Sequence, residues 1–375
     1  MFRRFFAIFK KEFRQIGRDR LTLGQLLLIP ALLLALYGYA LSFDVKHIGV
    51  AVVDLDRTPA SRALLDSLFQ NPYFSRRGDL ATMAAADDLL AHGGARAVLV
   101  IPRGYGKRLG RGELVHVQAL VDAADATSAV TAIGYLEAMA DRTTQQLRLA
   151  ELEQAGLPPA IPVIRPEPRI WFNAELNSAK FLVPGLTGML MMLAAVVATS
   201  LSIVREKERG TMEQLMVSPA RPAEIILGKT LPYVLICLAT MAMILLLGWL
   251  LFGVQVTGSW LLLGLSTLIF IFAALSMGLM ISAITRSQHM AFEIAILTTL
   301  LPSVILSGLI FPIKNMPLPI QGITLLVIPR YFVETLRGII LKDAPLAAIW
   351  PNLLGMLILG IAFSALAIRL TKKEN

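Results

Sequence analysis

The sequence is poor in cysteine and in charge, and both shortages restrict what the chain can be. Its one cysteine, Cys237, allows no intrachain disulfide and does not reveal the redox compartment. Charged residues make up 16% of the 375 residues and hydrophobic residues 56%, whereas soluble domains average roughly 25% and 45–50%. The composition therefore argues against a wholly soluble protein.

Long runs without a charged residue account for the apolar excess. Five such blocks cover 21–43, 181–204, 230–285, 294–313 and 344–368. A membrane-spanning helix needs ~20 apolar residues, and the third block is long enough for two helices separated by a turn at 253–260. The first block is longer than the ~7–15 residues of a signal-peptide core, which favours an uncleaved span. The sequence thus predicts six membrane spans.

Basic residues outside these blocks are unevenly distributed. Apart from the long segment 44–180, sixteen lie on one side of the predicted spans and four on the other. Because cytoplasmic loops carry the excess of Lys and Arg, we expect both termini and the loop 205–229 in the cytoplasm. The net charge of +9 comes from these segments, so we expect anionic inner-leaflet lipid as its partner and no nucleic acid.

Residues 1–20 combine an aromatic face with a basic one. Aromatic and aliphatic side chains recur every three or four residues at Phe2, Phe5, Phe6, Phe9, Phe13 and Ile16. This spacing predicts a basic amphipathic helix along the inner membrane surface, ahead of the first span at 21–43. It serves either as an anchor alone or also as a contact for a cytoplasmic partner.

The segment 44–180 reads as an inserted domain with an α/β pattern. We expect strands at 47–54, 95–101 and 115–122, and helices at 59–70, 83–91 and 128–154. Its fifteen basic and sixteen acidic residues nearly cancel. By the predicted topology this domain lies in the periplasm, and a proline-rich stretch at 157–168 leads back to the membrane.

Aspartates at the strand ends raise the question of catalysis. Asp54 and Asp56 close one expected strand, and Asp122 and Asp125 follow another. The histidines of the domain lack metal-ligand spacing, however, and no glycine-rich phosphate loop opens a helix. The pattern favours turn and N-cap roles for these aspartates over catalytic ones.

The loop 205–229 carries the most distinctive pattern. Gly210 ends the second span, Thr211 can begin a short helix with Leu215 as an apolar knob, and Pro219 stops it. Such a helix can fill a groove in a partner. The residues that we expect to couple to that partner are Glu206, Glu208, Arg209, Gly210, Thr211, Glu213, Gln214 and Leu215.

This loop, Arg-Glu-Lys-Glu-Arg-Gly-Thr-Met-Glu-Gln-Leu-Met-Val-Ser-Pro at 205–219, resembles that of permease subunits of type-2 ABC exporters with a large insertion after the first span. The similarity extends to Pro184-Gly185, Gly228-Lys229, Val53-Asp54-Leu55-Asp56, the run 306–317, Ile328-Pro329-Arg330-Tyr331 and Leu336-Arg337-Gly338. Ser218, in place of a frequent threonine, and Lys342-Asp343 depart from the family pattern.

The resemblance implies a subunit of the bacterial inner membrane that carries no cofactor. ATP and magnesium would be bound by two separate cytoplasmic ATPase subunits, and a second permease would complete a homo- or heterodimer. A periplasmic adaptor and an outer-membrane channel are further expected partners. The sequence also indicates that this chain binds no nucleotide. Gly228-Lys229-Thr230 is similar to the end of a phosphate-binding loop, but Ala223 occupies the position of the first glycine and the segment runs into a span.

The segment 302–343 is too rich in proline for an ordinary span yet largely apolar. Irregular backbone at membrane depth survives only inside protein or along a cavity, so we expect two short re-entrant helices that close the outer end of a transport route. A surface hairpin is the alternative. The residues expected along the route and at the dimer interface are Gly185, Gly188, Met189, Met192, Pro302, Gly308 and Pro312.

The sequence thus predicts an α-helical membrane protein with six spans, an interfacial helix, re-entrant helices and an inserted α/β domain. The favoured function is ATP-driven export of a hydrophobic or amphipathic, drug-like or lipid-like, substrate. A mechanotransmitter that passes ATPase motion to periplasmic partners remains an alternative. An ion-coupled transporter fits less well, because acidic residues near the bilayer midplane are missing from the predicted spans.

Overall fold

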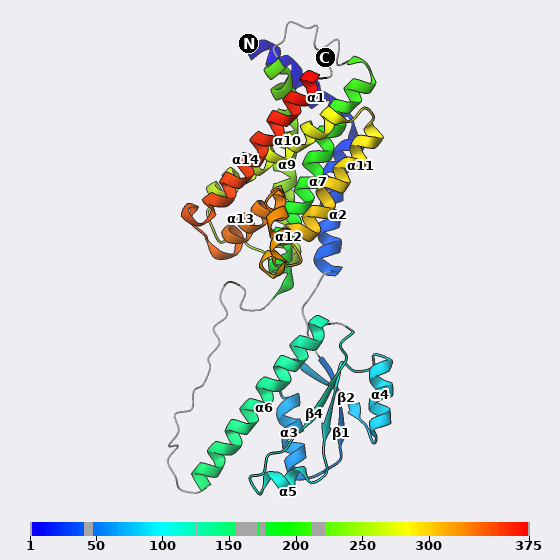
Figure 1. Ribbon diagram of the computed structural model, residues 1–375, viewed down its shortest axis with the longest axis vertical. Helices are drawn as coiled ribbons and strands as arrows, with labels where there is room; N and C mark the ends of the chain where they lie inside the picture. The colour runs from blue at the N-terminus through cyan, green and yellow to red at the C-terminus, as the bar shows by residue number, and fades with distance from the viewer. Residues whose placement is uncertain are drawn as a thin grey trace. The chain divides into compact units, whose positions relative to one another are not determined.

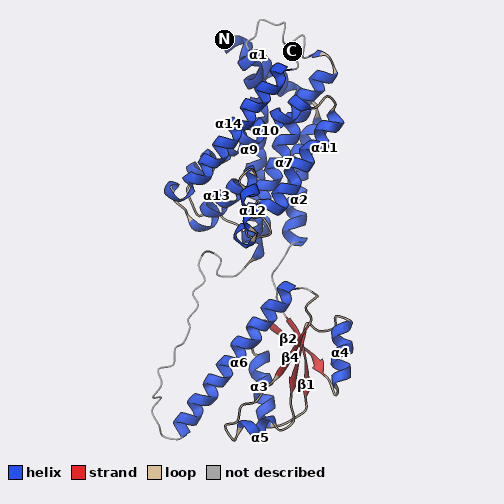
Figure 2. Cartoon of the chain, viewed as in Figure 1, coloured by secondary structure: helices blue, strands red, loops and turns tan. Residues whose placement is uncertain are grey.

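The computed structural model describes residues 2–40, 48–124, 126–154, 172, 177–211 and 222–373. The chain divides into two compact units, Met1–Ser42 with Arg169–Asn375, and Phe43–Pro168. The second unit is inserted into the first, and it ends earlier than the predicted boundary at 180. Helices dominate the first unit, whereas the second combines a sheet with helices (Figure 2).

The helical unit is a bundle of long helices (Figure 1). Its members are α1 (Phe2–Arg18), α2 (Arg20–Ala40), α7 (Ser178–Glu208), α9 (Pro222–Phe252), α10 (Trp260–Ile284), α11 (Gln288–Leu306) and α14 (Leu346–Lys373). Helix α7 is central, because it contacts α2, α9, α10, α11 and α13.

N-cap side chains of Asn177, Ser259 and Ser287 accept backbone hydrogen bonds at the starts of α7, α10 and α11. The left-handed Gly253 (φ +64°) ends α9 at the predicted turn.

Five helices of the described residues are long and apolar enough to cross a membrane. They cover Ser178–Glu208, Leu227–Phe252, Trp260–Ile284, Gln288–Leu306 and Leu346–Leu370, and match the second to sixth predicted spans. The expected first span corresponds to α2, whose described apolar part, Leu26–Ala40, is shorter. A count of six spans therefore stays a prediction.

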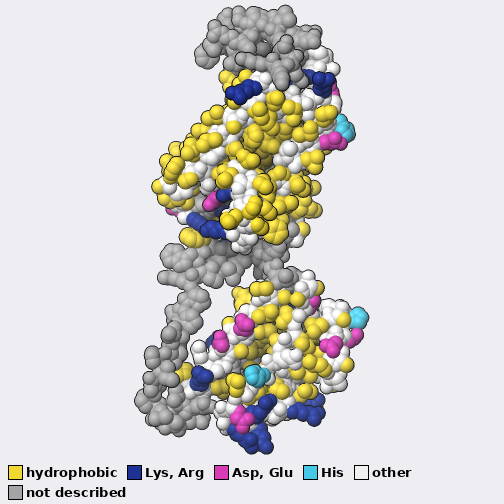
Figure 3. Space-filling model, viewed as in Figure 1, with side chains coloured by type: hydrophobic (Ala, Val, Ile, Leu, Met, Phe, Trp, Pro, Cys, Tyr) yellow, Lys and Arg dark blue, Asp and Glu magenta, His cyan; other side chains and the backbone are white. Residues whose placement is uncertain are grey.

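Large hydrophobic side chains cover much of the outside of this unit. The view in Figure 3 shows a largely apolar face with few charges. Leu28, Leu32, Trp249, Leu250 and Leu261 are each more than half exposed. Continuous apolar surface of this kind is rare on soluble monomers and fits contact with lipid.

The segment 302–343 forms a short 3-10 turn at Ile313–Asn315 and two helices, α12 (Leu318–Thr324) and α13 (Ile328–Lys342). Helix α13 is buried against α7, α10 and α14. Phe332 of α13 stacks on Phe270 of α10 with 3.9 Å between ring centroids. The segment is thus folded into the bundle, although its depth in a membrane stays a prediction.

The inserted unit has a four-stranded sheet in the order β2-β1-β3-β4. Strand β1 (Ile48–Asp54) pairs in parallel with β2 (Phe74–Asp79) and β3 (Ala97–Ile101), and β4 (Gln118–Val121) is antiparallel to β3. Alternate residues of β1 face opposite sides of the sheet. Its Val50 and Val52 side chains join α3 (Pro59–Phe69) and α6 (Ala126–Gln154), whereas Ala51 and Val53 join α4 (Met83–Ala91).

Six predicted elements of this unit are confirmed, with β4 shorter than expected. Strand β2 and the five-residue helix α5 (Tyr105–Leu109) were not predicted.

Candidate functional site

Four consecutive residues at the end of α7 join the other helices at one end of the bundle. Arg205 donates to Asp19, between α1 and α2, at 3.4 Å and to Gln288 of α11 at 3.2 Å. Lys207 donates to the carbonyl of Ser282 near the end of α10 at 2.6 Å. Glu206 and Glu208 make the remaining contacts described below. The helix that enters loop 209–221 is thereby tied to α1, α9, α10, α11 and the turn between α1 and α2.

Glu206 lies in a buried ion cluster. Its Oε2 is 2.8 Å from Nζ of Lys229 in α9, and its Oε1 is 3.1 Å from Nζ of Lys11 in α1. Lys229 is also 3.3 Å from Oε1 of Glu12. Glu12, Glu206 and Lys229 are each at most 6% exposed. Because a buried charge must be paired, this cluster fixes α1, α7 and α9 relative to one another.

Gly228 and Lys229 act together in this arrangement. A Cβ on Gly228 would lie 2.9 Å from Ile8 Cγ2 and 3.4 Å from the Phe5 carbonyl oxygen, so the missing side chain lets α1 approach α9. The next residue, Lys229, then reaches Glu12 of α1. Gly228 thus allows α9 to pack against α1, and Lys229 pairs α9 with carboxylates of α1 and α7.

Lys207 and Glu208 complement the ends of two helices. Lys207 sits at carbonyls near the α10 C-terminus, where the helix dipole favours a cation. Glu208 accepts from the backbone N–H of Gln288 at 2.7 Å and from its side-chain amide, at the start of α11, where a carboxylate is favoured. The end of α7 therefore bridges the α10–α11 junction.

The expected coupling residues differ in their surroundings. Arg209 and Gly210 are exposed, and Gly210 ends α7 in a left-handed conformation (φ +66°) as predicted. Thr211 donates to the Glu206 carbonyl at 3.3 Å, whereas Glu213, Gln214 and Leu215 lie outside the described residues. Glu206, one of the expected coupling residues, is buried inside the cluster, and its role in coupling stays a prediction.

Next to the ion cluster lies a cavity of about 410 Å³ between α1, α2, α7, α9 and α11. Charged and polar groups come from the loop end of the bundle, and apolar residues continue along the helices. The lining includes Glu12, Asp19, Arg205, Glu206 and Tyr233, followed by Leu26, Ile29, Leu33, Leu190, Leu193, Ala194, Val197, Phe292 and Ile296. Between Glu206 and Leu190, α7 covers about 24 Å at 1.5 Å per residue, so the cavity is long and amphipathic.

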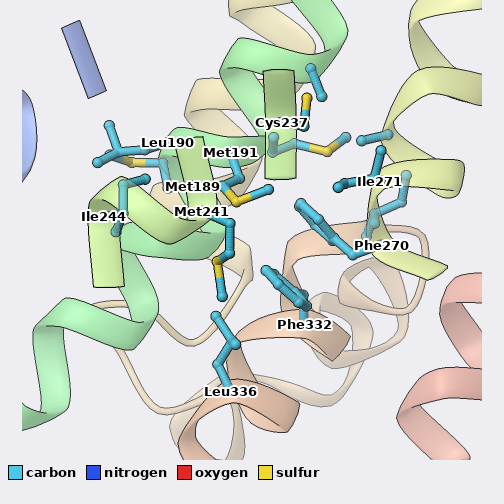
Figure 4. Close-up of a cluster of buried hydrophobic side chains, with 14 of the residues drawn as sticks. Met189, Leu190, Met191, Cys237, Met241, Ile244, Phe270, Ile271, Phe332 and Leu336 are labelled. Carbon is cyan, nitrogen blue, oxygen red and sulfur yellow. The ribbon is translucent and has the colours of Figure 1, made fainter. Parts of the chain in front are cut away.

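The predicted route residues of α7 lie elsewhere on that helix. Met189 is buried among Met191 of α7, Met241 of α9 and Phe332 of α13 (Figure 4). Met192 is 1% exposed, and Gly188 faces Val333 of the same chain.

Gly185 faces Leu309 of the same chain, so these glycines and methionines pack within this chain, and their part in a route or a dimer interface stays a prediction. The cavity is lined from α7 by Leu190, Leu193, Ala194 and Val197. Of the other predicted route residues, Gly308 is buried, Pro302 half-buried and Pro312 exposed.

The aspartates of the inserted unit are turn residues, as the sequence predicted. Asp54 accepts from the backbone N–H groups of Asp56 and Arg57 and from Ser61 Oγ at 2.7 Å. Asp56 accepts from Thr58 Oγ at 2.6 Å and from the N–H groups of Gly104 and Gly106. The Thr58 hydroxyl and the Gly106 N–H hold the pKa of Asp56 below its usual value. Asp122 accepts from Ala124, and Asp125 lies outside the described residues.

Known proteins resemble this chain over nearly its whole length. Residues 21–369 match the family described as ABC-2 family transporter protein. The chain belongs to the ABC-2 transporter family. It is 31% identical to the probable multidrug ABC transporter permease YbhS of Escherichia coli K12, over 99% of this chain and 97% of that protein. It is 26% identical to YbhR of the same strain, over the full length of both, and 28% identical to the inner membrane transport permease YhhJ, over 85% and 83%.

As an ABC-2 permease, the chain is a multi-pass membrane transport subunit, and ATP hydrolysis belongs to a separate subunit. The position of Lys229 agrees, because its ammonium group is held by the carboxylates of Glu12 in α1 and Glu206 in α7. Sequence reasoning missed Glu12, Lys11 and Lys229 of the ion cluster. One signal for them was present: Glu12 lies four residues before Ile16 on the buried face of α1, where an acid is unusual.

Proposed function

We propose that this chain is the membrane-spanning subunit of an ATP-driven exporter of hydrophobic or amphipathic molecules. One observation carries the proposal: Glu12, Arg205 and Glu206 line the long cavity and also hold the helices that flank loop 209–221. A movement imposed on that loop would therefore change the cavity directly. The polar end and the apolar walls suit a molecule with one charged or polar group and a hydrophobic body.

The proposed complex contains two such permeases and two ATPase subunits, which contact loop 209–221 from the cytoplasm. Both termini then lie in the cytoplasm of a bacterial cell, and the inserted unit lies in the periplasm. The excess of basic residues in the two terminal segments and in loop 205–229 supports this orientation. A periplasmic adaptor and an outer-membrane channel could attach through the inserted unit, and isolation of the tagged chain from native membranes would identify such partners.

Filling the cavity tests the export route. Ala194→Trp places an indole among the apolar side chains that line the cavity, whereas Leu261→Trp changes a lipid-exposed position of α10 that is 77% exposed. We expect Ala194→Trp to lower export by about tenfold or more, equivalent to ~1.4 kcal/mol, with the complex still assembled and hydrolysing ATP. Export would be measured as the tolerance of cells to a panel of hydrophobic and amphipathic drugs.

Leu261→Trp should leave drug tolerance unchanged. Normal tolerance in an assembled Ala194→Trp complex would contradict a route through this cavity. It would favour the mechanotransmitter, in which ATPase motion reaches the inserted unit without a substrate between the helices.

A further inference from the structure

The inserted unit has a cavity of its own, about 570 Å³ in volume. Helix α6 forms one wall, and the other walls come from α3, α5, β3, β4 and the segment 112–117. Helices α6 and α3 cover the same face of the sheet (Figure 1), where Ala132 and Leu136 of α6 are buried in the core. The cavity begins at Leu136 and follows α6 toward its C-terminus.

One face of α6 continues from the core into this cavity. The side chains of Leu136, Met139, Thr143 and Leu147 recur every three or four residues, so they share a face of the helix, and all of them line the cavity. Leu136 is 8% exposed, whereas Leu147 is 37% exposed. At 1.5 Å per residue, this face is about 17 Å long. Together with the half-buried Val115, it offers an apolar wall to the body of a ligand.

A buried tyrosine adds a polar group to the cavity. Tyr105 of α5 lines it and is only 5% exposed. Among the described residues the Tyr105 hydroxyl has no hydrogen-bond partner, although it is not sealed off from solvent. Burial raises the pKa of Tyr105, so the hydroxyl remains a donor at neutral pH. A buried donor without a protein partner is costly, and an acceptor oxygen on a bound molecule would satisfy it.

The charged groups around the cavity offset one another. Arg148 and Glu137 both line it from α6, and both are exposed. Glu113, on another wall, lies 3.6 Å from the guanidinium of Arg111. The walls therefore favour no net charge on a ligand. They suit an uncharged molecule with an apolar body and an oxygen that accepts a hydrogen bond.

We propose that the inserted unit binds an uncharged amphipathic molecule in this cavity, with a ligand oxygen accepting from the Tyr105 hydroxyl and the apolar body lying along α6. The site is separate from the cavity beside the ion cluster, since the two have no lining residue in common. A part for this site in export rests on the proposed function, whereas the binding itself does not.

Protection of a cysteine from thiol labelling tests the site in the full-length chain in lipid nanodiscs. In a Cys237→Ala background, Ala140→Cys reports on the cavity, because Ala140 lines it and is exposed. Val130→Cys is the control reporter on the same helix, because Val130 is 71% exposed and lies outside the lining. The labelling reagent is a polar maleimide. The ligand probe is Nile red, an uncharged apolar dye with a carbonyl oxygen, and no nucleotide is added.

We expect saturating Nile red to slow the labelling of Ala140→Cys by about tenfold and to leave that of Val130→Cys unchanged. Tyr105→Phe should raise the dye concentration for half-protection by about fivefold, which corresponds to a hydrogen bond of ~1 kcal/mol. Because the hydroxyl has no partner among the described residues, this variant should unfold at the wild-type temperature. Tyr135→Phe is the matched control and should leave protection unchanged, since Tyr135 stacks on Tyr73 outside the lining.

Three results would overturn the site. Unchanged labelling of Ala140→Cys would mean that the cavity does not bind the dye, and equal slowing at both reporters would mean that the dye adsorbs without a site. Equal half-protection with Tyr105 and with Tyr105→Phe would remove the hydroxyl from the binding.

None of these results bears on the export function, which Ala194→Trp tests at the other cavity. Conversely, loss of the export function would leave the protection of Ala140→Cys by Nile red as expected. If Tyr105→Phe does not fold, the comparison of the two reporters with Tyr105 in place still decides whether the cavity binds.

Discussion

Lys229 is the residue on which the loop end of the bundle most depends. Its ammonium group is 4% exposed and neutralises two buried carboxylates, whereas Lys11 contacts Glu206 from a side chain that is 52% exposed. Lys229→Met should lower stability by about 3–5 kcal/mol, because it leaves uncompensated buried charge. Lys11→Met should lower it by less than about 1 kcal/mol. Thermal unfolding in detergent measures both, and equal losses would contradict the cluster as described.

Asp56 gives the inserted unit a pH dependence of known sign. Its folded-state pKa lies below the ordinary 3.8, because Thr58 and the Gly106 N–H donate to the carboxylate. Its contribution to stability is therefore complete above pH 3.8 and is lost as the pH falls through the lower folded-state value. Hydrogen-exchange protection of residues 102–112 in the full-length protein should fall in this acid range. In Asp56→Asn that fall should be smaller, and an unchanged pH profile would exclude the carboxylate as its cause.

At this scale the sequence predicted what depends on near neighbours. Asp54 binds backbone groups of its own turn and Asp56 binds the hydroxyl of Thr58 two residues on, so strand-end position was enough to indicate a turn role. The pairing of Lys11 with Glu206 joins residues 195 apart, and no local pattern encodes it. The sequence therefore gave no sign of the partners that Glu206 has within the chain.

Among the elements, the end of α7 sets the direction in which loop 209–221 begins. Gly210 is left-handed there, and Gly210→Ala would add strain of about 1–2 kcal/mol or extend the helix by rewinding the residue. We expect transport per ATP hydrolysed to fall in Gly210→Ala, because the loop would leave α7 in a different direction. Gly210→Asn tolerates the left-handed conformation and should retain most coupling. Equal coupling in both variants would rule out a role for this turn.

The elements that sequence analysis missed have little periodic signal. Strand β2 reads Phe-Ser-Arg-Arg-Gly-Asp, with Phe74 as its only buried residue, since it is an edge strand paired to β1 alone. Helix α5 is five residues long and follows the left-handed Gly104. Its place depends on Asp56, which binds the N–H groups of Gly104 and Gly106 from another loop. Long apolar helices needed no such context, so five predicted spans were found with small shifts of their ends.

For the whole molecule, the decisive measurement is the sidedness of the two units. The side chain of Val130 in α6 is 71% exposed. In a Cys237→Ala background, Val130→Cys should therefore react with an impermeant thiol reagent added to the periplasm. Arg369→Cys, near the end of α14, should react only after the membrane is permeabilised. The reverse pattern would overturn the orientation inferred from the basic residues.

Composition alone was sufficient for the class of the molecule, because helices that cross a bilayer must be apolar along ~20 residues. The same reasoning could not tell which face of each helix meets which neighbour. All faces of α7 are apolar over most of its length, so the side that lines the cavity and the side that meets α13 look alike in sequence. That is why the sequence singled out Met189 and Gly188, whereas Ala194 and Val197 are the residues that line the cavity.

The ion cluster has a consequence for how the chain is made. Glu12 and Lys11 leave the ribosome early, but their partner Glu206 follows Lys11 by 195 residues, and Lys229 comes later still. At synthesis rates of ~5–20 residues per second, α1 waits roughly 10–40 seconds before Glu206 exists. Until then its aromatic face must rest on lipid or on a chaperone. Closure of the cluster is therefore a late event in biogenesis, and a nascent chain that stalls before α9 lacks Lys229, the buried cation that contacts both Glu12 and Glu206.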